Sequence, residues 1–430
     1  MEKDGTLKVA VNEGVVEGFK VKGNVKTKDY VVTREMKLKK GEPFNAKAAR
    51  RSMQRVYNLG YFEDVNIKLN PGREPNGVEV EISVVEMNTG TFGIGAGYSN
   101  ADGFVGMVSI GDKNFRGIGD KINLRWEFGG EDNKNYDFSY TRPWLDDKET
   151  SATINLYDIT NEYADYNIDG DEIARYDKKR RGQEITFSRR THNEFISNYI
   201  TIKNRDDIYK GEADGYEGDE NQYYEDKFNQ SSKYESWMPK TAAERRKENF
   251  GVTRSITFGR VYDSRDNIYD PHEGKRIGYS VEWAGGMGGD FDFTKWTADW
   301  RYYFRAGGES VWALNLGAGY ASGDMPLSQR FTMGGSDTLR GYEDDQFRGN
   351  SMLKATLEYR FPIVKKVQGV LFTDNGYAWD KRHEDEFDMG LLKNSYGVGL
   401  RINSPLGPVK LDYGYGEDGG KFHFSFGGQF

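Results

Sequence analysis

Residues Leu353–Phe361 read LKATLEYRF, and apolar and polar side chains alternate along this stretch without a break. A period of two residues is typical of a β-strand with one apolar and one polar face. The same alternation recurs from Thr91–Tyr98 to the C-terminal stretch Lys421–Phe430. Such segments begin near residues 91, 104, 120, 133, 150, 183, 195, 251, 275, 292, 309, 351, 367, 394, 407 and 421. These sixteen segments form an even number, as bacterial single-chain barrels require. The pattern therefore predicts that residues 91–430 form a sixteen-stranded antiparallel transmembrane β-barrel.

The overall composition fits this fold and excludes several others. Mean hydropathy is −0.81, a value that would also suit a disordered chain. However, aromatic residues make up 14% of the 430 residues and glycine occurs 53 times, whereas disordered chains are poor in aromatic residues. The sequence lacks cysteine, which excludes disulfides, and its net charge of −8 argues against a nucleic-acid partner. A soluble β-sandwich does not explain aromatic faces that recur over so many strands.

The segment before residue 90 differs in composition and predicts one small α+β domain over residues 16–88. We expect the order β-α-α-β-β. The strands are expected at Val16–Lys22, Phe62–Leu69 and Val78–Val85, and the helices at Lys28–Met36 and from the N-cap Asn45 to the C-cap Gly60. No signal peptide follows Met1. Residues 1–15 are therefore interpreted as the remnant of a preceding module, with Thr6–Val11 as its last strand, or as an artificial start of the chain.

Connection lengths give an independent check on the strand count. If the small domain is periplasmic, the first, third and every later odd connection faces outward. Four long segments then lie outside, at 160–182, 205–250, 319–350 and 380–393, and the short turns at 142–149, 192–194, 305–308, 362–366 and 403–406 lie opposite. The segments 260–274 and 111–119 are exceptions. Short turns opposite long loops are typical of outer-membrane barrels. Residues 205–250, with a short helix predicted at Thr241–Glu248, are interpreted as a solvated loop rather than a ligand site.

Four stretches in the small domain resemble a known periplasmic module. They are FKVKGN at Phe19–Asn24, Arg34-Glu35, GEPFN at Gly41–Asn45 and VYNLGYFEDV at Val56–Val65. Each has an ordinary structural explanation, but the ordered set resembles the POTRA domains of the BamA/TamA superfamily of outer-membrane insertases. This resemblance implies that residues 16–88 lie in the periplasm and that residues 91–430 lie in the bacterial outer membrane.

A second resemblance lies in the segment before the twelfth strand. Leu339–Tyr342 reads LRGY, which is similar to a (Val/Leu)-Arg-Gly-(Phe/Tyr) motif shared by this superfamily and its two-partner-secretion relatives. The resemblance implies that the loop folds back into the barrel, where Arg340, beside Gly341 and Tyr342, pairs with acidic groups on the inner wall. The matching acids here are Glu358 and Asp374. The alternative is an exposed arginine in a turn.

The alternation pattern bears differently on the two acids. Glu358 shares a face with the polar residues of its segment, as a residue of the barrel interior should. Asp374 has the same parity as Phe372, so its direction stays open. An arginine that meets two carboxylates in a wide interior can hold a loop by charge-assisted hydrogen bonds.

A third motif, Tyr262–Asn267 with Pro271 and Gly274, resembles a periplasmic turn of the same superfamily. Asp263, Arg265 and Asp266 are its charged residues, and we interpret them as a structural turn held by Asp–Arg pairing. A calcium site built from the nearby carboxylates is the alternative. The four histidines are scattered and do not follow metal-ligand spacing, so we expect neither a metal nor a cofactor.

The first and last strands are rich in glycine, which weakens strand packing and raises backbone freedom. We expect them to form a poorly paired lateral seam. Its residues are Phe92, Gly93, Gly95 and Gly97 on one side and Phe426, Gly427, Gly428 and Phe430 on the other. In the superfamily this seam opens sideways, and an unpaired edge can template an incoming strand. The glycines could also merely relieve crowding where the barrel closes.

The expected function is therefore that of a non-enzymatic insertase, which folds other β-barrel proteins and inserts them into the outer membrane. A two-partner-secretion translocator pore and a TamA-like insertase remain alternatives, while a passive porin or lipase does not explain the POTRA-like domain. Expected partners are outer-membrane lipids and lipopolysaccharide, unfolded barrel-protein clients, and periplasmic chaperones or accessory assembly proteins, but no nucleic acid. The sequence leaves open the number of further POTRA modules.

Overall fold

The computed structural model describes residues 13–99, 103–129, 133–166, 172–212, 250–268, 270–379, 389–404, 407–417 and 419–426. The chain divides into two compact units. The first comprises Met1–Phe92 with Ile110–Asn123, and the second comprises Gly93–Ser109 with Leu124–Phe430.

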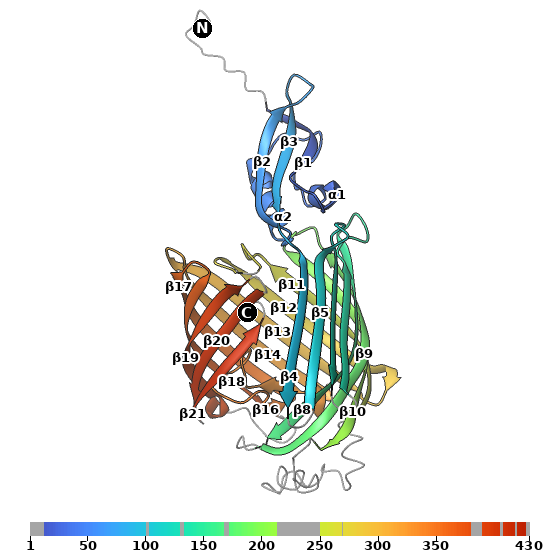
Figure 1. Cartoon of the computed structure of the whole chain (residues 1–430), viewed down its shortest axis with the longest axis vertical. Coiled ribbons are helices and arrows are strands. Elements are labelled where there is room, and N and C mark those ends of the chain that lie inside the picture. The colour runs from blue at the N-terminus through green and yellow to red at the C-terminus, as the bar shows by residue number, and fades with distance from the viewer. Residues whose placement is uncertain are drawn as a thin grey trace, which may run out of the picture. The chain divides into compact units, whose positions relative to one another are not determined.

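The first unit contains a three-stranded sheet and two helices, shown in blue in Figure 1. In chain order these elements are β1 (Val15–Lys22), α1 (Asp29–Thr33), α2 (Ala46–Tyr57), β2 (Phe62–Pro71) and β3 (Gly77–Glu86). The sheet order is β1-β3-β2, in which β1 runs parallel to β3 and β2 antiparallel to it. Both helices contribute to one apolar core with the sheet, through Val31, Val56 and Ile82 among others. This is the predicted β-α-α-β-β order.

The ends of the two helices differ from the prediction. Helix α2 begins as expected, because the Asn45 side chain accepts a hydrogen bond from the Ala48 amide at 3.0 Å. Its C-cap is Asn58, whereas Gly60, the predicted cap, takes a left-handed φ of 74° two residues later. Helix α1 ends at Thr33, three residues short of the prediction, after consecutive β-branched residues that favour helix weakly. The predicted strand Thr6–Val11 lies outside the described residues.

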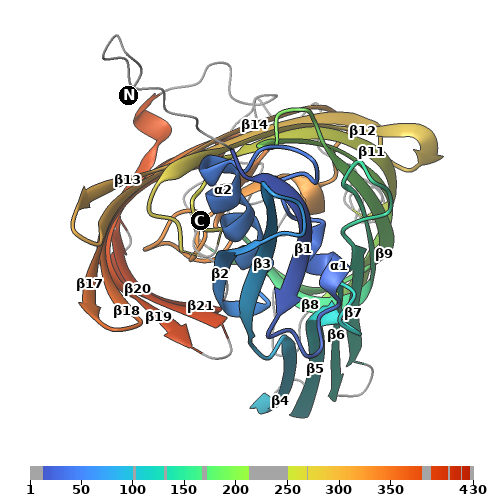
Figure 2. The ribbon, with the colours of Figure 1, turned by 90° about the horizontal axis from the view of Figure 1, so that it is seen from above.

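In the described part of the chain, a second sheet has sixteen strands that follow one another in chain order from β4 to β21. They are β4 (Gly90–Ser99), β5 (Gly103–Phe115), β6 (Asp120–Gly129), β7 (Asn133–Arg142), β8 (Thr150–Tyr166), β9 (Glu172–Arg190), β10 (Ile196–Glu212), β11 (Gly251–Asp263), β12 (Gly274–Gly289), β13 (Phe293–Gly307), β14 (Ser310–Gly323), β17 (Ser351–Val364), β18 (Val367–Trp379), β19 (Lys393–Ser404), β20 (Gly407–Gly416) and β21 (Gly419–Phe426). Two short strands, β15 (Phe331–Met333) and β16 (Phe347–Gly349), pair separately between β14 and β17. The strands curve around a common interior (Figure 2), so the predicted sixteen-stranded antiparallel barrel is confirmed.

One strand start was predicted wrongly. Strand β9 begins at Glu172 rather than near residue 183, and β8 continues to Tyr166, so most of the predicted loop 160–182 is a long hairpin. The ladder with β8 continues through the charged run Asp177–Arg181 of this segment, and Lys179 pairs with Asp158 at 2.9 Å. Cross-strand pairing therefore outweighs the polar composition.

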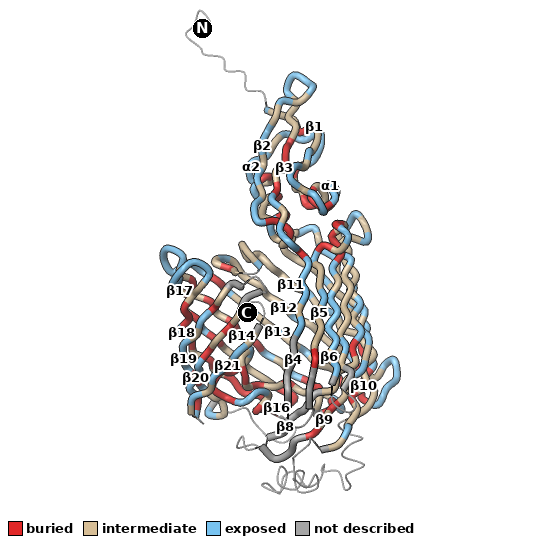
Figure 3. Tube along the Cα trace, viewed as in Figure 1, coloured by how far each residue is buried: buried red, intermediate tan, exposed pale blue. Residues whose placement is uncertain are grey.

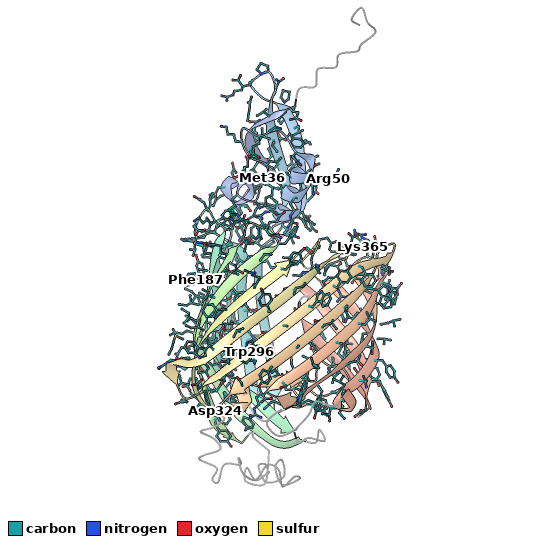
Figure 4. All side chains as sticks on the ribbon, turned by 180° about the vertical axis from the view of Figure 1, so that it is seen from behind. Met36, Arg50, Phe187, Trp296, Asp324 and Lys365 are labelled. Carbon is teal, nitrogen blue, oxygen red and sulfur yellow. The ribbon has the colours of Figure 1, made fainter. Side chains whose placement is uncertain are left out.

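Two other predicted loops begin later than expected. Strand β10 extends to Glu212, and the loop after β14 begins at Asp324. Lys365 lies in the turn between β17 and β18. Asp324 and Lys365 lie at opposite ends of the strands (Figure 4). Residues 213–249, including the predicted helix Thr241–Glu248, lie outside the described residues.

The two faces of this sheet differ in chemistry. Phe187 and Trp296 lie on its outer surface (Figure 4), with 46% and 41% of their area exposed. Buried positions instead recur along β17, β18 and β20, where they include Glu358, Asp374 and Asp412 (Figure 3). An outer surface of apolar side chains and an interior of charged side chains is the arrangement expected of a barrel surrounded by lipid.

No helix in the described part of the chain is long and apolar enough to span a membrane.

Candidate functional site: a loop anchored to the barrel interior

One arginine of the long loop between β14 and β17 is buried against the barrel strands. Arg340 is 3% exposed. Its guanidinium donates two hydrogen bonds to Asp374 of β18, from Nε to Oδ2 at 2.7 Å and from Nη2 to Oδ1 at 2.8 Å. The Arg340 backbone amide also donates to Oδ2 at 3.1 Å. Such a two-pronged contact fixes the direction of the guanidinium as well as its position.

The third guanidinium nitrogen of Arg340 joins a wider charge network. Nη1 donates to Oε1 of Glu358 on β17 at 2.7 Å. Glu358 also pairs with Arg360 at 2.7 Å and with Arg401 of β19 at 3.1 Å. Arg401 in turn donates to Asp412 of β20 at 2.6 Å. The network thus contains three arginines and three carboxylates, so its buried charges balance. Its members are Arg340, Arg360, Arg401, Glu358, Asp374 and Asp412.

The surroundings keep Arg340 charged. Burial alone lowers the pKa of Arg340, but the carboxylates of Glu358 and Asp374 outweigh burial, and the pKa lies above its ordinary value. The guanidinium also lies 3.4 Å from the ring centroid of Phe372, a cation–π contact. Because every partner is buried, removal of one charge leaves another without compensation.

Glycine allows the loop backbone to approach the wall closely. Gly341 has a left-handed φ of 91°, and a Cβ there would lie 2.9 Å from the Gly416 amide nitrogen. In return, a Cβ on Gly414 would lie 2.6 Å from the Gly341 nitrogen. Next in the chain, the Tyr342 hydroxyl donates to the Asn394 carbonyl at 3.1 Å. The Arg-Gly-Tyr sequence therefore provides a charge, a close backbone approach and a hydrogen bond in succession.

We predict that Gly341→Ala undocks this loop. The added Cβ would be strained by the left-handed φ and would clash with β20. We expect the docked conformation to be destabilised by more than about 1 kcal/mol. Gly419→Ala is a matched control, because Gly419 has a similar φ of 103° but no atom within 4 Å of the added Cβ. Thermal melting of both variants in detergent measures the difference. Equal melting temperatures would contradict a role for the close approach.

The same loop is also bonded to the last strand, β21. The Gly341 amide donates to Nε2 of His423 at 2.9 Å. Glu343, two residues further along, forms an ion pair with Lys421. The acceptor role of Nε2 requires the neutral ring with its proton on Nδ1. The loop is thus attached to the strand at one end of the sixteen-strand order.

The structure brings together the residues that the sequence singled out for this loop: Arg340, Gly341, Tyr342, Glu358 and Asp374. The open question about Asp374 is answered, because Asp374 and Phe372 both point to the interior and contact the same guanidinium. Sequence reasoning missed further members of the network, namely Arg360, Arg401, Asp412, Gly414 and His423. Only Arg360 carried a usable signal, since it lies two residues from Glu358 on the same strand face.

The seam residues are described in part. Phe92 and Ile94 of β4 are 62% and 72% exposed, and a Cβ on Gly93 would lie 2.6 Å from the Ser109 hydroxyl oxygen. Gly95 and Gly97 belong to β4, and Phe426 ends β21. Gly427, Gly428 and Phe430 lie outside the described residues. In the described strand order, β4 and β21 each have one neighbour and do not pair with each other.

The turn between β11 and β12 is held as the sequence suggested. Arg265 donates to both oxygens of Asp263, at 2.9 and 2.7 Å. Oδ1 of Asp266 accepts hydrogen bonds from the backbone amides of His272 and Glu273, at 3.0 and 3.1 Å. These carboxylates are occupied by protein donors, and the described residues contain no group of three or more metal-ligating side chains.

Comparison with known proteins agrees with this geometry. Residues 114–430 match the Omp85 superfamily domain. The chain belongs to the Omp85 superfamily. Residues 15–87 match the POTRA family, described as a surface antigen variable number repeat. The resemblance to the BamA-type superfamily inferred from the sequence is confirmed.

Several relatives of this Omp85 chain carry names. Outer membrane protein assembly factor BamA of Nitratidesulfovibrio vulgaris is 30% identical over 447 residues, which cover 98% of this chain and 51% of that protein. Chloroplastic outer envelope protein 80 of Arabidopsis thaliana is 26% identical, with 94% of this chain and 54% of that protein covered. The Omp85 chain thus spans about half the length of these curated relatives.

Solved structures show the same fold. BamA from Haemophilus ducreyi lacking POTRA domains 1–3 superimposes with a TM-score of 0.58 at 20% identity. The match covers 99% of this chain and 86% of the Haemophilus chain. CdiB from Escherichia coli superimposes with a TM-score of 0.62 at 13% identity, with 96% and 76% covered. At these identities the likeness establishes the Omp85 fold alone.

Proposed function

We propose that this chain is the membrane end of an insertase that folds β-barrel proteins and places them in the bacterial outer membrane. The observation that carries the proposal is the strand order, which ends at β4 and β21 without a described ladder between them. A strand at the end of a sheet presents unpaired N–H and C=O groups, which can template an incoming strand. The Nitratidesulfovibrio relative is named as an outer membrane protein assembly factor, which supports this role.

In this proposal the anchored loop regulates the seam. The loop holds β21 through His423 and Lys421, while Arg340 fixes the loop to β17 and β18. Loss of the loop contacts would release β21 from one of its restraints and leave its outer edge more available to a client strand. The free energy for insertion comes from strand pairing and apolar burial of the client, so the proposed mechanism needs neither a catalytic residue nor a cofactor.

The proposed location follows from the same chemistry. Exposed aromatic side chains on the outer surface, such as Phe187 and Trp296, suit contact with outer-membrane lipids and lipopolysaccharide. The POTRA domain would then lie in the periplasm, where unfolded barrel proteins, chaperones and accessory assembly proteins are available. A BamA-like role is preferred to a TamA-like one because of the named relatives.

Depletion of the full-length protein tests the proposal. We expect the abundance of many unrelated outer-membrane barrels to fall together, because each needs an edge strand as a template. Quantitative proteomics of isolated outer membranes measures this change, with inner-membrane helical proteins as the internal control. Loss of one secreted protein with unchanged barrels would instead indicate a translocator pore of the two-partner-secretion type.

A further inference from the structure

A polar cavity of about 390 Å³ lies beside the Arg340 network, whose side chains form part of its lining. Loop residues Ser336, Asp337 and Thr338 contribute to its lining, together with inward-facing residues of the strands. Its charged lining consists of three carboxylates and six cations: Asp337, Glu358, Asp374, Arg301, Arg340, Lys354, Arg360, Arg401 and Lys410. Asp299 and Asp412, which pair with Arg301 and Arg401 next to the cavity, bring the carboxylates to five, so one positive charge is in excess around this space.

Most of these cations have partners, and one does not. Arg340, Arg360 and Arg401 pair within the network, Lys410 pairs with Asp337 at 2.7 Å and Arg301 pairs with Asp299 at 3.0 Å. Lys354 makes neither an ion pair nor a hydrogen bond with any residue that the structure describes. An ammonium group that lines a polar cavity without a direct ion-pair partner is a binding determinant for an anion.

A buried amide points to the same place. Asn315 is 2% exposed, lines the cavity, and its Oδ1 lacks a hydrogen-bond partner in the described structure. Buried side-chain amides are normally hydrogen-bonded, so the unpartnered Asn315 amide is available to a group bound in the cavity. Because the amide can turn about its last bond, it can present its NH₂ group, which donates two hydrogen bonds, in place of Oδ1.

The sheet register places these groups within reach of one small ion. Asn315 of β14 lies directly opposite Arg301 of β13 and Thr356 of β17. Lys354 lies two residues from Thr356 on the same face, diagonal to Asn315. Directly opposite side chains in a sheet have Cβ atoms about 5 Å apart and diagonal ones about 7–8 Å apart. Guanidinium, ammonium and amide groups can therefore converge from three neighbouring strands.

We propose that this cavity binds a phosphate-type oxyanion. A phosphate group offers at least three acceptor oxygens, which suits donors on Arg301, Asn315 and Lys354, whereas a carboxylate offers two. Its negative charge also offsets the excess of cations. Since the loop contributes to the lining, the bound anion contacts the loop and the strands together and stabilises the docked loop by mass action.

Titration of the full chain in non-ionic detergent with inorganic phosphate, against chloride at equal ionic strength, tests the site. Isothermal titration calorimetry gives the affinity, and thermal melting gives the stabilisation. We expect saturable binding to the wild type and an affinity about tenfold lower in Lys354→Met, because a hydrogen bond to a charged group is lost. Lys179→Met, which removes the same charge away from the cavity, should bind phosphate as the wild type does.

A second variant keeps the test decisive if Lys354→Met folds poorly. Asn315→Asp places a carboxylate opposite Arg301, so it should remain folded, shown by heat-dependent mobility on a gel, and lose phosphate binding. Equal affinity in the wild type and both variants would overturn the site, as would tighter binding of a short acidic peptide than of phosphate. Stronger binding of glucosamine phosphate than of inorganic phosphate would support the site and identify a lipid headgroup as the source.

Discussion

Replacement of Arg340 by alanine is expected to lower the free energy of unfolding by roughly 3–5 kcal/mol, the usual cost of removing one partner from a buried ion pair. The variant leaves Asp374 without its two-pronged partner and leaves one carboxylate in excess over the remaining Arg360 and Arg401. The Gly341 and Tyr342 contacts depend on the same loop position, so they should weaken too. Thermal melting in detergent, read from gel mobility, measures the loss.

Two variants separate the pairing geometry from charge alone. Arg340→Lys keeps the charge but cannot contact Asp374 with two parallel N–H groups, so we expect a melting temperature between those of wild type and Arg340→Ala. Arg276→Ala is the matched control, because Arg276 pairs with Asp299 where about a quarter of each side chain is exposed, and such pairs contribute little. An unchanged melting temperature in Arg340→Ala would show that the network does not hold the loop.

The fold could be predicted from the sequence because the barrel pattern is local. Alternation such as that of Leu353–Phe361 places each side chain on one face without knowledge of its neighbours. The prediction failed where neighbours decide. The charged stretch Asp177–Arg181 lies in the segment 160–182 that was predicted as a loop, but β8 and β10 on either side hold it in the sheet. Helix ends failed similarly, because Gly60 marked a turn without being the cap.

The site could be predicted only as far as the motif and strand parity reach. Arg340 and Glu358 followed from the motif and the alternation, and the structure joins them at 2.7 Å. Asp412 and His423 meet the loop from β20 and β21, more than seventy residues away in the chain. No periodicity encodes such a distance, because the closing geometry of the barrel decides which strands face the loop. A lone histidine in an alternating strand therefore carried no sign of its role.

A disulfide across the seam should have the largest effect on function. The chain has no cysteine, so one introduced at Gly93 or Ile94 of β4 and one in Phe422–Ser425 of β21 can form a disulfide only with each other. We expect the oxidised protein to lose insertion of barrel clients, because a locked edge cannot exchange its partner for an incoming strand. Reduction should restore activity. Insertion of an unfolded barrel client into vesicles that contain the oxidised or the reduced protein measures the activity of each state.

The control is a disulfide between strands that are already paired. Leu357 and Thr373 lie opposite each other in the β17–β18 ladder, so a cysteine pair there joins the same sheet without touching its ends. This variant should insert clients equally well when oxidised and reduced. Full activity of the locked seam variant would exclude sideways opening. The seam and the loop are coupled through His423 and Lys421, so Arg340→Ala should alter the rate at which the seam cysteines cross-link, while Arg276→Ala should not.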